Sequence, residues 1–200
     1  MLLWKLMLKE VRQMIIHKII EGTTVNGPGL RLGIWVQGCK LNCLGCFNEE
    51  VCTANGGTQM TIEQIVKLLD KQNYDGITVS GGEPFDQESE LALLLKEVKA
   101  KGKNTLVFTG YIYDEVYTTE SIKYCDYLID GPFIKDIPPI CKYTGSGNQR
   151  FLRLENGLIA EDLTIKYRGA DDSEIIISAD GTILVTGFSK FNEEYVIYGR

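Results

Sequence analysis

Three cysteines stand close together in the first quarter of the chain, at Cys39, Cys43 and Cys46. Their spacing is Cys-x3-Cys-x2-Cys. Cysteine thiolates hold iron–sulfur clusters, and three of them can wrap a [4Fe–4S] cube while one iron keeps no protein ligand. A substrate can bind at such an open iron. The spacing therefore predicts a catalytic iron–sulfur site.

Structural zinc is the alternative for the same cysteines. A tetrahedral zinc site takes four ligands, commonly as two separated pairs. Cys52 could be the fourth ligand, but no second pair follows it. Cys125 and Cys141 are scattered, and a buried free thiol is the simpler interpretation of each. We prefer the iron–sulfur site, and a metal-binding protein without catalysis stays the alternative.

A glycine-rich segment, Gly81-Gly82-Glu83-Pro84, follows the apolar run of residues 75–80. Two adjacent glycines allow a ligand to approach the backbone without obstruction by side chains. Glu83 adds a carboxylate. Alone, such a segment is an ordinary turn between a strand and a helix. Placed after the three cysteines, it predicts a second part of the same ligand site.

Apolar runs alternate with helical periodicity along most of the chain, which predicts an α/β fold. The runs typical of strands are residues 14–20, 30–37, 75–80, 105–109 and 127–130, and the helical segments are residues 61–72, 86–100 and 114–119. Alternation of this kind favours parallel strands joined by right-handed crossovers. Ligands collect at the carboxyl ends of such strands, where the glycine-rich segments of this chain stand.

The two ends of the chain differ from this pattern. Residues 1–14 predict an amphipathic helix. From Leu163 onward, short β-branched segments and an Asp180-Gly181 turn predict a small antiparallel unit. The predicted organisation is an N-terminal helix (1–14), a core domain (15–157) and a C-terminal β appendage (158–200).

Composition narrows the classes of function. The 200 residues carry 27 acidic and 21 basic side chains, a net charge of −6, which argues against a nucleic-acid partner. No run reaches the length of about 20 apolar residues that crosses a bilayer, and the first residues lack the pattern of a signal peptide. One histidine, His17, cannot make a multi-histidine metal site. Six cysteines in a chain of this size favour reduced thiols, so we expect a cytoplasmic protein without a membrane partner.

Five segments together resemble the radical S-adenosylmethionine superfamily and, within it, the activating proteins of anaerobic (class III) ribonucleotide reductases. They are VNGPGLR (25–31), QGCKLNCLGCFN (37–48), GGEPF (81–85), LIDGPF (128–133) and GSGNQR (145–150). The resemblance implies a partial (β/α) barrel of the radical SAM type, here with a small C-terminal antiparallel β appendage. It also implies reductive cleavage of S-adenosylmethionine to a 5′-deoxyadenosyl radical, which takes hydrogen from a glycine of a large glycyl-radical enzyme.

The resemblance also assigns residues to the cofactors. It implies that Cys39, Cys43 and Cys46 ligate a [4Fe–4S] cluster. It implies that S-adenosylmethionine is contacted by seven further residues, namely Gly45 and Phe47 near the adenine, Gly81, Gly82 and Glu83 at the methionine end, Pro84 in the turn, and Asp130 near the ribose or methionine. Asn148, Gln149 and Arg150 receive no role.

The partners that the resemblance implies are an anaerobic ribonucleotide reductase as protein substrate and a flavodoxin- or ferredoxin-like electron donor. A radical enzyme that modifies another peptide, protein or small metabolite is the alternative. In that case the C-terminal appendage would be a recognition module.

Overall fold

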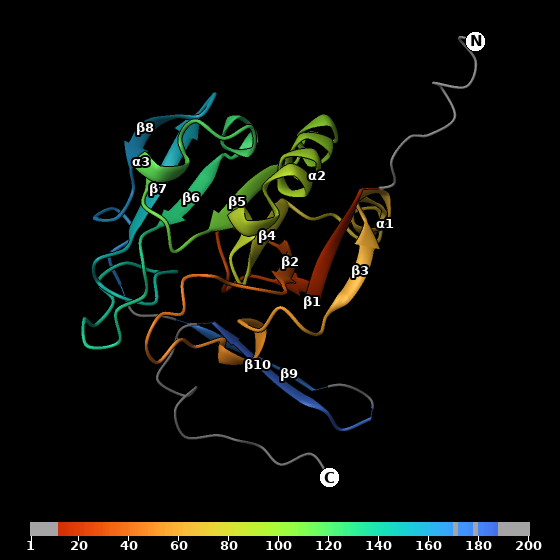
Figure 1. Cartoon of the computed structure of the whole chain (residues 1–200), viewed down its shortest axis with the longest axis horizontal. Helices are drawn as coiled ribbons and strands as arrows, with labels where there is room; N and C mark the ends of the chain where they lie inside the picture. Colours follow the sequence, from red (N-terminus) through yellow and green to blue (C-terminus); the bar gives the residue numbers. More distant parts are fainter. Residues whose placement is uncertain (1–11, 170–171, 178–179, 188–200) are drawn as a thin grey trace.

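The computed structural model describes residues 12–169, 172–177 and 180–187. Eight strands form one sheet in the order β3-β1-β2-β4-β5-β6-β7-β8, and β9 with β10 forms a separate hairpin (Figure 1). The strands are β1 (Gln13–Thr23), β2 (Arg31–Val36), β3 (Thr58–Thr61), β4 (Gly76–Gly81), β5 (Asn104–Phe108), β6 (Tyr127–Asp130), β7 (Arg150–Glu155), β8 (Leu158–Asp162), β9 (Ser173–Ile177) and β10 (Ile183–Gly187). The helices are η2 (Glu49–Val51), α1 (Ile62–Leu68), η3 (Pro84–Gln87), α2 (Glu88–Ala100), α3 (Tyr113–Val116) and η4 (Ser121–Tyr124).

The centre of the sheet is parallel. Strands β2, β4, β5 and β6 pair in parallel, and antiparallel strands flank them on both sides. The four parallel strands therefore end at one edge of the sheet, where loops can meet. The predicted mixed α/β architecture is confirmed. The described strands form an open sheet with β3 and β8 at its edges, so no closed barrel is present in this part of the chain.

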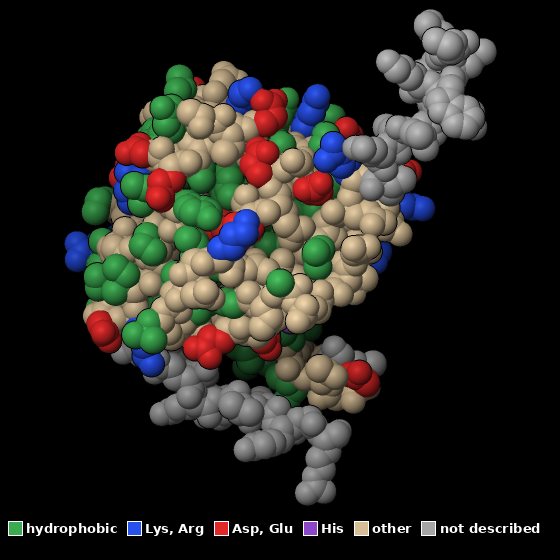
Figure 2. All heavy atoms as spheres, viewed as in Figure 1, with side chains coloured by type: hydrophobic (Ala, Val, Ile, Leu, Met, Phe, Trp, Pro, Cys, Tyr) green, Lys and Arg blue, Asp and Glu red, His purple; other side chains and the backbone are tan. Residues whose placement is uncertain are grey.

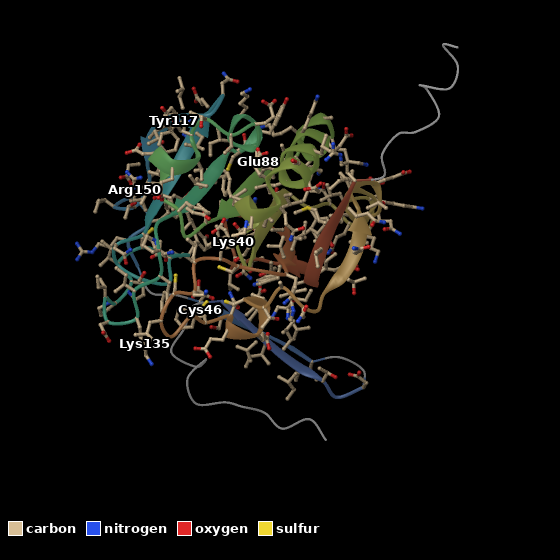
Figure 3. The ribbon with its side chains drawn as sticks, viewed as in Figure 1. Lys40, Cys46, Glu88, Tyr117, Lys135 and Arg150 are labelled. Atoms are coloured by element: carbon tan, nitrogen blue, oxygen red, sulfur yellow. The ribbon has the colours of Figure 1, made fainter. Side chains whose placement is uncertain are left out.

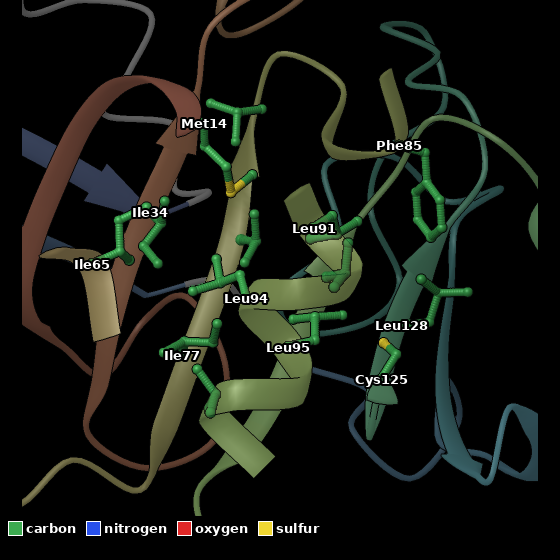
Figure 4. Close-up of a cluster of buried hydrophobic side chains, with 14 of the residues drawn as sticks. Met14, Ile34, Ile65, Ile77, Phe85, Leu91, Leu94, Leu95, Cys125 and Leu128 are labelled. Atoms are coloured by element: carbon green, nitrogen blue, oxygen red, sulfur yellow. The ribbon is translucent and has the colours of Figure 1, made fainter. Parts of the chain in front are cut away.

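The larger hydrophobic core lies between the sheet and its helices. Leu91, Leu94 and Leu95 of α2 are fully buried in one cluster with Ile77 of β4 and Leu128 of β6 (Figure 4). Burying a leucine side chain stabilises a fold by about 2 kcal/mol. Helices α1, α2, α3 and η4 contribute side chains to this core on one face of the sheet, and residues of loops pack on the opposite face.

A second, smaller core lies on that opposite face. Successive residues of a strand point to opposite faces of the sheet. Leu106 of β5 and Ile129 of β6 therefore point away from the larger core and pack with Phe151 of β7. Acidic and basic side chains are interspersed on the molecular face shown in Figure 2. No described helix is long and apolar enough to span a membrane.

The start of α1 is a capping box, formed by Thr61 and Gln64. Thr61 Oγ1 accepts a hydrogen bond from Gln64 N at 3.1 Å, and Gln64 Oε1 accepts one from Thr61 N at 2.8 Å. The exchange satisfies two backbone donors that a helix start leaves unpaired. The helix ends at Leu68, four residues short of the predicted end at Gln72, because a turn follows.

The ends of the chain differ from the predicted organisation. Strand β8 pairs with β7, so residues 158–162 belong to the main sheet and not to an appendage. Residues 164–167 form a turn within the predicted antiparallel unit. The hairpin around Asp180-Gly181 is confirmed. The predicted helix at residues 1–14 lies largely outside the described residues, and its last two positions begin β1. The end of the predicted appendage, residues 188–200, also lies outside them.

Candidate active site

A cavity of about 580 Å³ opens beside the carboxyl ends of the parallel strands. The segment after β2 brings three cysteines to it, and the segment after β4 brings a glycine pair and an acid. The predicted site residues that line the cavity are Cys39, Cys43, Cys46, Phe47, Gly81, Gly82 and Glu83. The structure therefore brings both predicted parts of the site together.

The cysteine loop is held to η2 and closes on itself. Gly38 N donates to Val51 O at 2.7 Å, and Cys46 N donates to Cys43 O at 3.2 Å. All six cysteines are free thiols, and the three of the motif are partly exposed. Three thiols around one open cavity are a donor set that fits an iron–sulfur cluster. Among the described residues, no three histidine, cysteine or acidic side chains converge to hold a single metal ion.

Cys52 lies beside this loop, although the sequence placed it among the alternatives. It lines the same cavity, and its backbone carbonyl accepts from Cys39 N at 3.3 Å. Burial and the neighbouring Cys46 and Cys39 sulfurs raise the pKa of the Cys52 thiol to about 12. Cys52 is therefore a fourth sulfur close to the predicted cluster ligands.

The glycine pair packs against the cysteine loop. Gly82 N donates to Val36 O and Glu83 N donates to Gly38 O, both at 2.8 Å. A Cβ at Gly82 would lie 2.0 Å from Gly38 O, and Gly81 has a φ of +105°. Glycine is therefore required here for a close approach between two segments of the protein, in addition to any approach by a ligand.

A side chain strengthens this junction. Asp86 Oδ2 accepts from Lys40 N at 3.0 Å, and Asp86 Oδ1 lies 3.3 Å from Lys40 Nζ. Lys40 and Cys46 are labelled on the cysteine loop in Figure 3. The loop is thus tied to the turn after β4 by backbone and side-chain contacts.

Glu83 is a buried acid with every near partner supplied by the protein. Only 1% of its surface is exposed. Its carboxylate accepts from Thr109 Oγ1 at 2.9 Å, from Gly110 N at 2.9 Å and from Phe85 N at 3.0 Å. Burial raises the pKa of Glu83 to about 7, against the lowering effect of these donors. The side chain therefore joins the ends of β4 and β5 at the wall of the cavity.

Two aromatic rings form another part of the wall. Phe47 is 47% exposed, and its ring centroid lies 4.7 Å from that of Phe133 at an interplanar angle of 52°. Phe133 was not among the predicted contacts, although it ends the LIDGPF segment. Paired rings of this kind offer an apolar surface to a flat ligand such as a purine.

Known proteins resemble this chain over most of its length. A protein-family profile described as "4Fe-4S single cluster domain" matches residues 25–152. The anaerobic ribonucleoside-triphosphate reductase-activating protein of Enterobacteria phage T4 is 34% identical over 145 residues, covering 69% of this chain and 93% of the phage protein. Its namesake in Escherichia coli strain K12 is 32% identical over 145 residues, covering 66% and 94%. The chain belongs to the radical S-adenosylmethionine family of activating proteins.

Further similarities extend within this activating-protein family. The pyruvate formate-lyase-activating enzyme of Staphylococcus epidermidis is 39% identical over 102 residues, which cover 48% of this chain and 41% of that enzyme. Among solved structures, QueE from Escherichia coli matches with a TM-score of 0.42 and 15% identity over 49% of this chain and 53% of that chain, too weak a likeness to support an argument. The cofactors of this activating protein are a [4Fe–4S] cluster and S-adenosylmethionine.

Three of the predicted contacts stand apart from the cavity lining. Gly45 has a φ of +68°, and a Cβ there would lie 2.9 Å from Lys135 Cδ. Pro84 is buried at the start of η3. Asp130 is 1% exposed and faces protein donors. In this activating protein these three residues shape the loops around the cavity, and their contact with S-adenosylmethionine stays a prediction.

The GSGNQR segment, to which the sequence assigned no role, braces the LIDGPF segment. Arg150 pairs with the Asp130 carboxylate. Gln149 Nε2 donates to Gly131 O at 2.9 Å, and Asn148 Nδ2 donates to Pro132 O at 2.7 Å. Consecutive side chains thus bind consecutive residues of the segment that presents Phe133.

The opposite wall of the cavity was missed by sequence reasoning. It contains Lys18, Trp35 and Asn26 together with all of β10. Lys18 Nζ lies 5.4 Å from the Trp35 ring centroid, and burial lowers the pKa of Lys18. Asn26 belongs to the VNGPGLR segment, and this motif could have marked it as a site residue. No motif in β10 marked its residues as part of the site.

Proposed function

We propose that this chain generates the glycyl radical of an anaerobic ribonucleoside-triphosphate reductase. The observation that carries the proposal is the single cavity in which three motif cysteines, the glycine pair and Glu83 meet. Relatives named as activating proteins of that reductase match over 93–94% of their own length. The radical is expected to be used within the cavity's reach, because a primary carbon radical is too reactive to diffuse away.

Each part of the cavity has a separate task in this proposal. Cys39, Cys43 and Cys46 hold the cluster. When bound, the cluster supplies the electron that breaks the bond between sulfur and C5′ of S-adenosylmethionine. The buried Glu83 carboxylate lies at the wall where a substrate ammonium group would be attracted to it.

The aromatic part of the cavity has the complementary task. Phe47 and Phe133 offer their rings to the adenine, while Gly81 and Gly82 line the part of the cavity that would take the methionine. Holding both ends of the substrate fixes C5′ relative to the glycine that donates hydrogen. The protein therefore contributes orientation and protection of the radical, and leaves bond cleavage to the cofactor.

The remaining expectations complete the proposal. The open sheet corresponds to a partial (β/α) barrel of the radical SAM type, with the cavity at its carboxyl edge. A flavodoxin- or ferredoxin-like protein in the cytoplasm supplies the electron. The unit that carries the site runs from β1 through β8 and so extends past the predicted boundary at residue 157.

The test uses the full chain, reconstituted anaerobically with iron and sulfide and reduced with dithionite. S-Adenosylmethionine and the candidate reductase are added, and the reductase is examined by electron paramagnetic resonance. We expect an organic radical signal that narrows when the glycine of the reductase is deuterated. Formation of 5′-deoxyadenosine without a radical on the reductase would contradict this choice of target. Activation of a pyruvate formate-lyase in its place would identify that partner instead.

A further inference from the structure

The hairpin of β9 and β10 lies next to η2 and the segment that carries the cysteines (Figure 1). All five residues of β10, from Ile183 to Gly187, line the cavity that the cysteines line. The hairpin follows residue 152, where the match to the family profile ends. This wall of the site is therefore contributed by a part of the chain beyond the family match.

Polar contacts, one buried and two exposed, fix the hairpin in this place. Asn26 Nδ2 donates to Thr186 Oγ1 at 2.9 Å, and these two residues are only 4% and 6% exposed. Thr24 donates to Glu174 Oε1 from its backbone N at 2.9 Å and from its Oγ1 at 2.6 Å. These contacts hold the hairpin in a specific position against the main sheet.

Strand β10 ends at Gly187, where the structure has no room for any other residue type. Gly187 has a φ of +107°, and a Cβ there would lie 2.3 Å from Asp172 O and 2.9 Å from Ser173 Cα. The hydrogen in the side-chain position thus points at the Asp172 carbonyl, and the other Cα hydrogen points away from it. Loss of a hydrogen from glycine Cα is favourable, because the flanking peptide groups delocalise the unpaired electron.

We propose that Gly187 is an internal hydrogen donor: the hairpin occupies the place of the partner's glycine and presents the chain's own glycine to the cavity. The inference rests on the proposed function. A C5′–H bond forms on the 5′-deoxyadenosyl radical while the Cα–H bond of Gly187 breaks. The unpaired electron moves to Gly187 Cα, and the products are 5′-deoxyadenosine and a glycyl radical. The only co-reactant is the one-electron donor that cleavage of S-adenosylmethionine already requires.

The proposal gives the hairpin a consequence for the partner. While β10 lines the cavity, a glycine from another chain cannot occupy the same volume. The partner has to displace the hairpin by breaking the contacts of Asn26 with Thr186 and of Thr24 with Glu174. Without a partner, the radical passes to Gly187 and not to solvent or to the cavity wall.

The test uses the full, cluster-loaded chain, labelled with glycine in which deuterium replaces both Cα hydrogens. It is reduced with dithionite and given S-adenosylmethionine without any partner, and the 5′-deoxyadenosine is analysed by mass spectrometry. We expect deuterium in the nucleoside and a glycyl radical signal. On admission of air, we expect backbone cleavage at Gly187, seen in the intact mass.

Two variants locate the donor. Gly187→Ala removes the deuterated residue at this position and should reduce deuterium in the nucleoside to the background of unlabelled protein. The matched control is Gly181→Asn, because Gly181 lies in the turn of the same hairpin and has a φ of +85° that asparagine tolerates. No atom lies within 4 Å of the position that a Cβ of residue 181 would occupy. This control should keep the deuterium transfer.

A second measurement does not depend on turnover. Amide hydrogen exchange of residues 183–187 is followed with and without S-adenosylhomocysteine, which cannot be cleaved to a radical. Because β10 lines the cavity, we expect this ligand to slow exchange there, and the same measurement on Gly187→Ala reports whether its hairpin is still docked. If the amide exchange rate in β10 is the same with and without S-adenosylhomocysteine, the proposal is overturned.

The outcomes separate this inference from the function on which it rests. Unlabelled 5′-deoxyadenosine from the labelled wild-type chain overturns the inference alone. Deuterium transfer that persists in Gly187→Ala also overturns it, since another glycine is then the donor. Absence of any 5′-deoxyadenosine from the iron-loaded chain overturns the proposed function and the inference together.

Discussion

Arg150 and Asp130 form a two-point ion pair where β6 ends and β7 begins, with Nε of Arg150 3.0 Å from Oδ1 of Asp130 and Nη2 bonded to Oδ2. The Asp130 carboxylate is buried and also accepts from Tyr113 N at 2.8 Å. Its oxygens are therefore engaged by the protein. The pair fixes the segment that presents Phe133 to the cavity. The buried Asp130 carboxylate therefore contributes to the site by holding this segment in place.

Removing the arginine should destabilise the fold. Arg150→Ala leaves a buried carboxylate without its cation, and because Arg150 itself is partly exposed we expect a loss of about 2 kcal/mol, between the values for exposed and buried pairs. Urea unfolding under anaerobic conditions measures the loss. Arg153→Ala is the matched control on β7, because its partners Glu155 and Glu161 are exposed and its loss should stay below about 1 kcal/mol. Equal losses in the two variants would refute the account of Asp130.

Glu83 should make stability depend on pH. Burial raises its pKa from 4.5 to about 7 in the folded chain, so the folded state binds more protons than the unfolded state between these values. Stability from this group is therefore fully present below about pH 4.5 and is lost as the pH rises through 7. In Glu83→Gln this dependence should disappear. Urea unfolding from pH 5 to pH 8 checks it, and parallel profiles for the two proteins would contradict the raised pKa.

Gly82 should be needed for assembly of the site. In Gly82→Ala the new Cβ would lie 2.0 Å from Gly38 O, which forces the turn after β4 away from the cysteine loop. We expect less iron after reconstitution and weaker binding of S-adenosylmethionine by calorimetry. Gly169→Ala is the control, because no atom lies within 4 Å of its Cβ position. Normal iron content in Gly82→Ala would show that the contact is dispensable.

How far the sequence predicts this molecule depends on whether the cause is local. The strand before Gly81 and the helix that begins near Thr61 were predicted, because neighbouring residues determine them. Strand β8 was misassigned to the appendage, because only its pairing with β7 places Leu158 in the main sheet. The contact between Asn26 and Thr186 joins residues 160 positions apart. No local sequence pattern around either residue predicts this contact.

The site shows the same division. The motif cysteines and Glu83 were predicted from spacing and resemblance, and they line one cavity. The packing of Gly82 on Gly38 was not foreseen, because a glycine pair gives no sign of what approaches it. Whether the approaching group is a ligand or the protein's own backbone follows from tertiary structure alone.

The cysteines should differ in their effect on iron content. Replacement of Cys43 by Ala should prevent cluster assembly, because two thiols remain in the motif. Cys125→Ala should keep the iron, because this thiol is buried in the core beside Leu128, away from the cavity. Cys52→Ala should also keep it if three thiols suffice. Iron and sulfide analysis after reconstitution measures all three, and loss of iron in Cys52→Ala would make Cys52 a ligand.

The central claim is that this cavity cleaves S-adenosylmethionine at a cluster held by three cysteines. Its most direct test is the yield of 5′-deoxyadenosine from the dithionite-reduced, reconstituted chain, compared with Cys43→Ala treated in the same way. We expect the nucleoside from the wild-type chain and none from the variant. A wild-type chain that binds its iron and sulfide but produces no 5′-deoxyadenosine would contradict the claim.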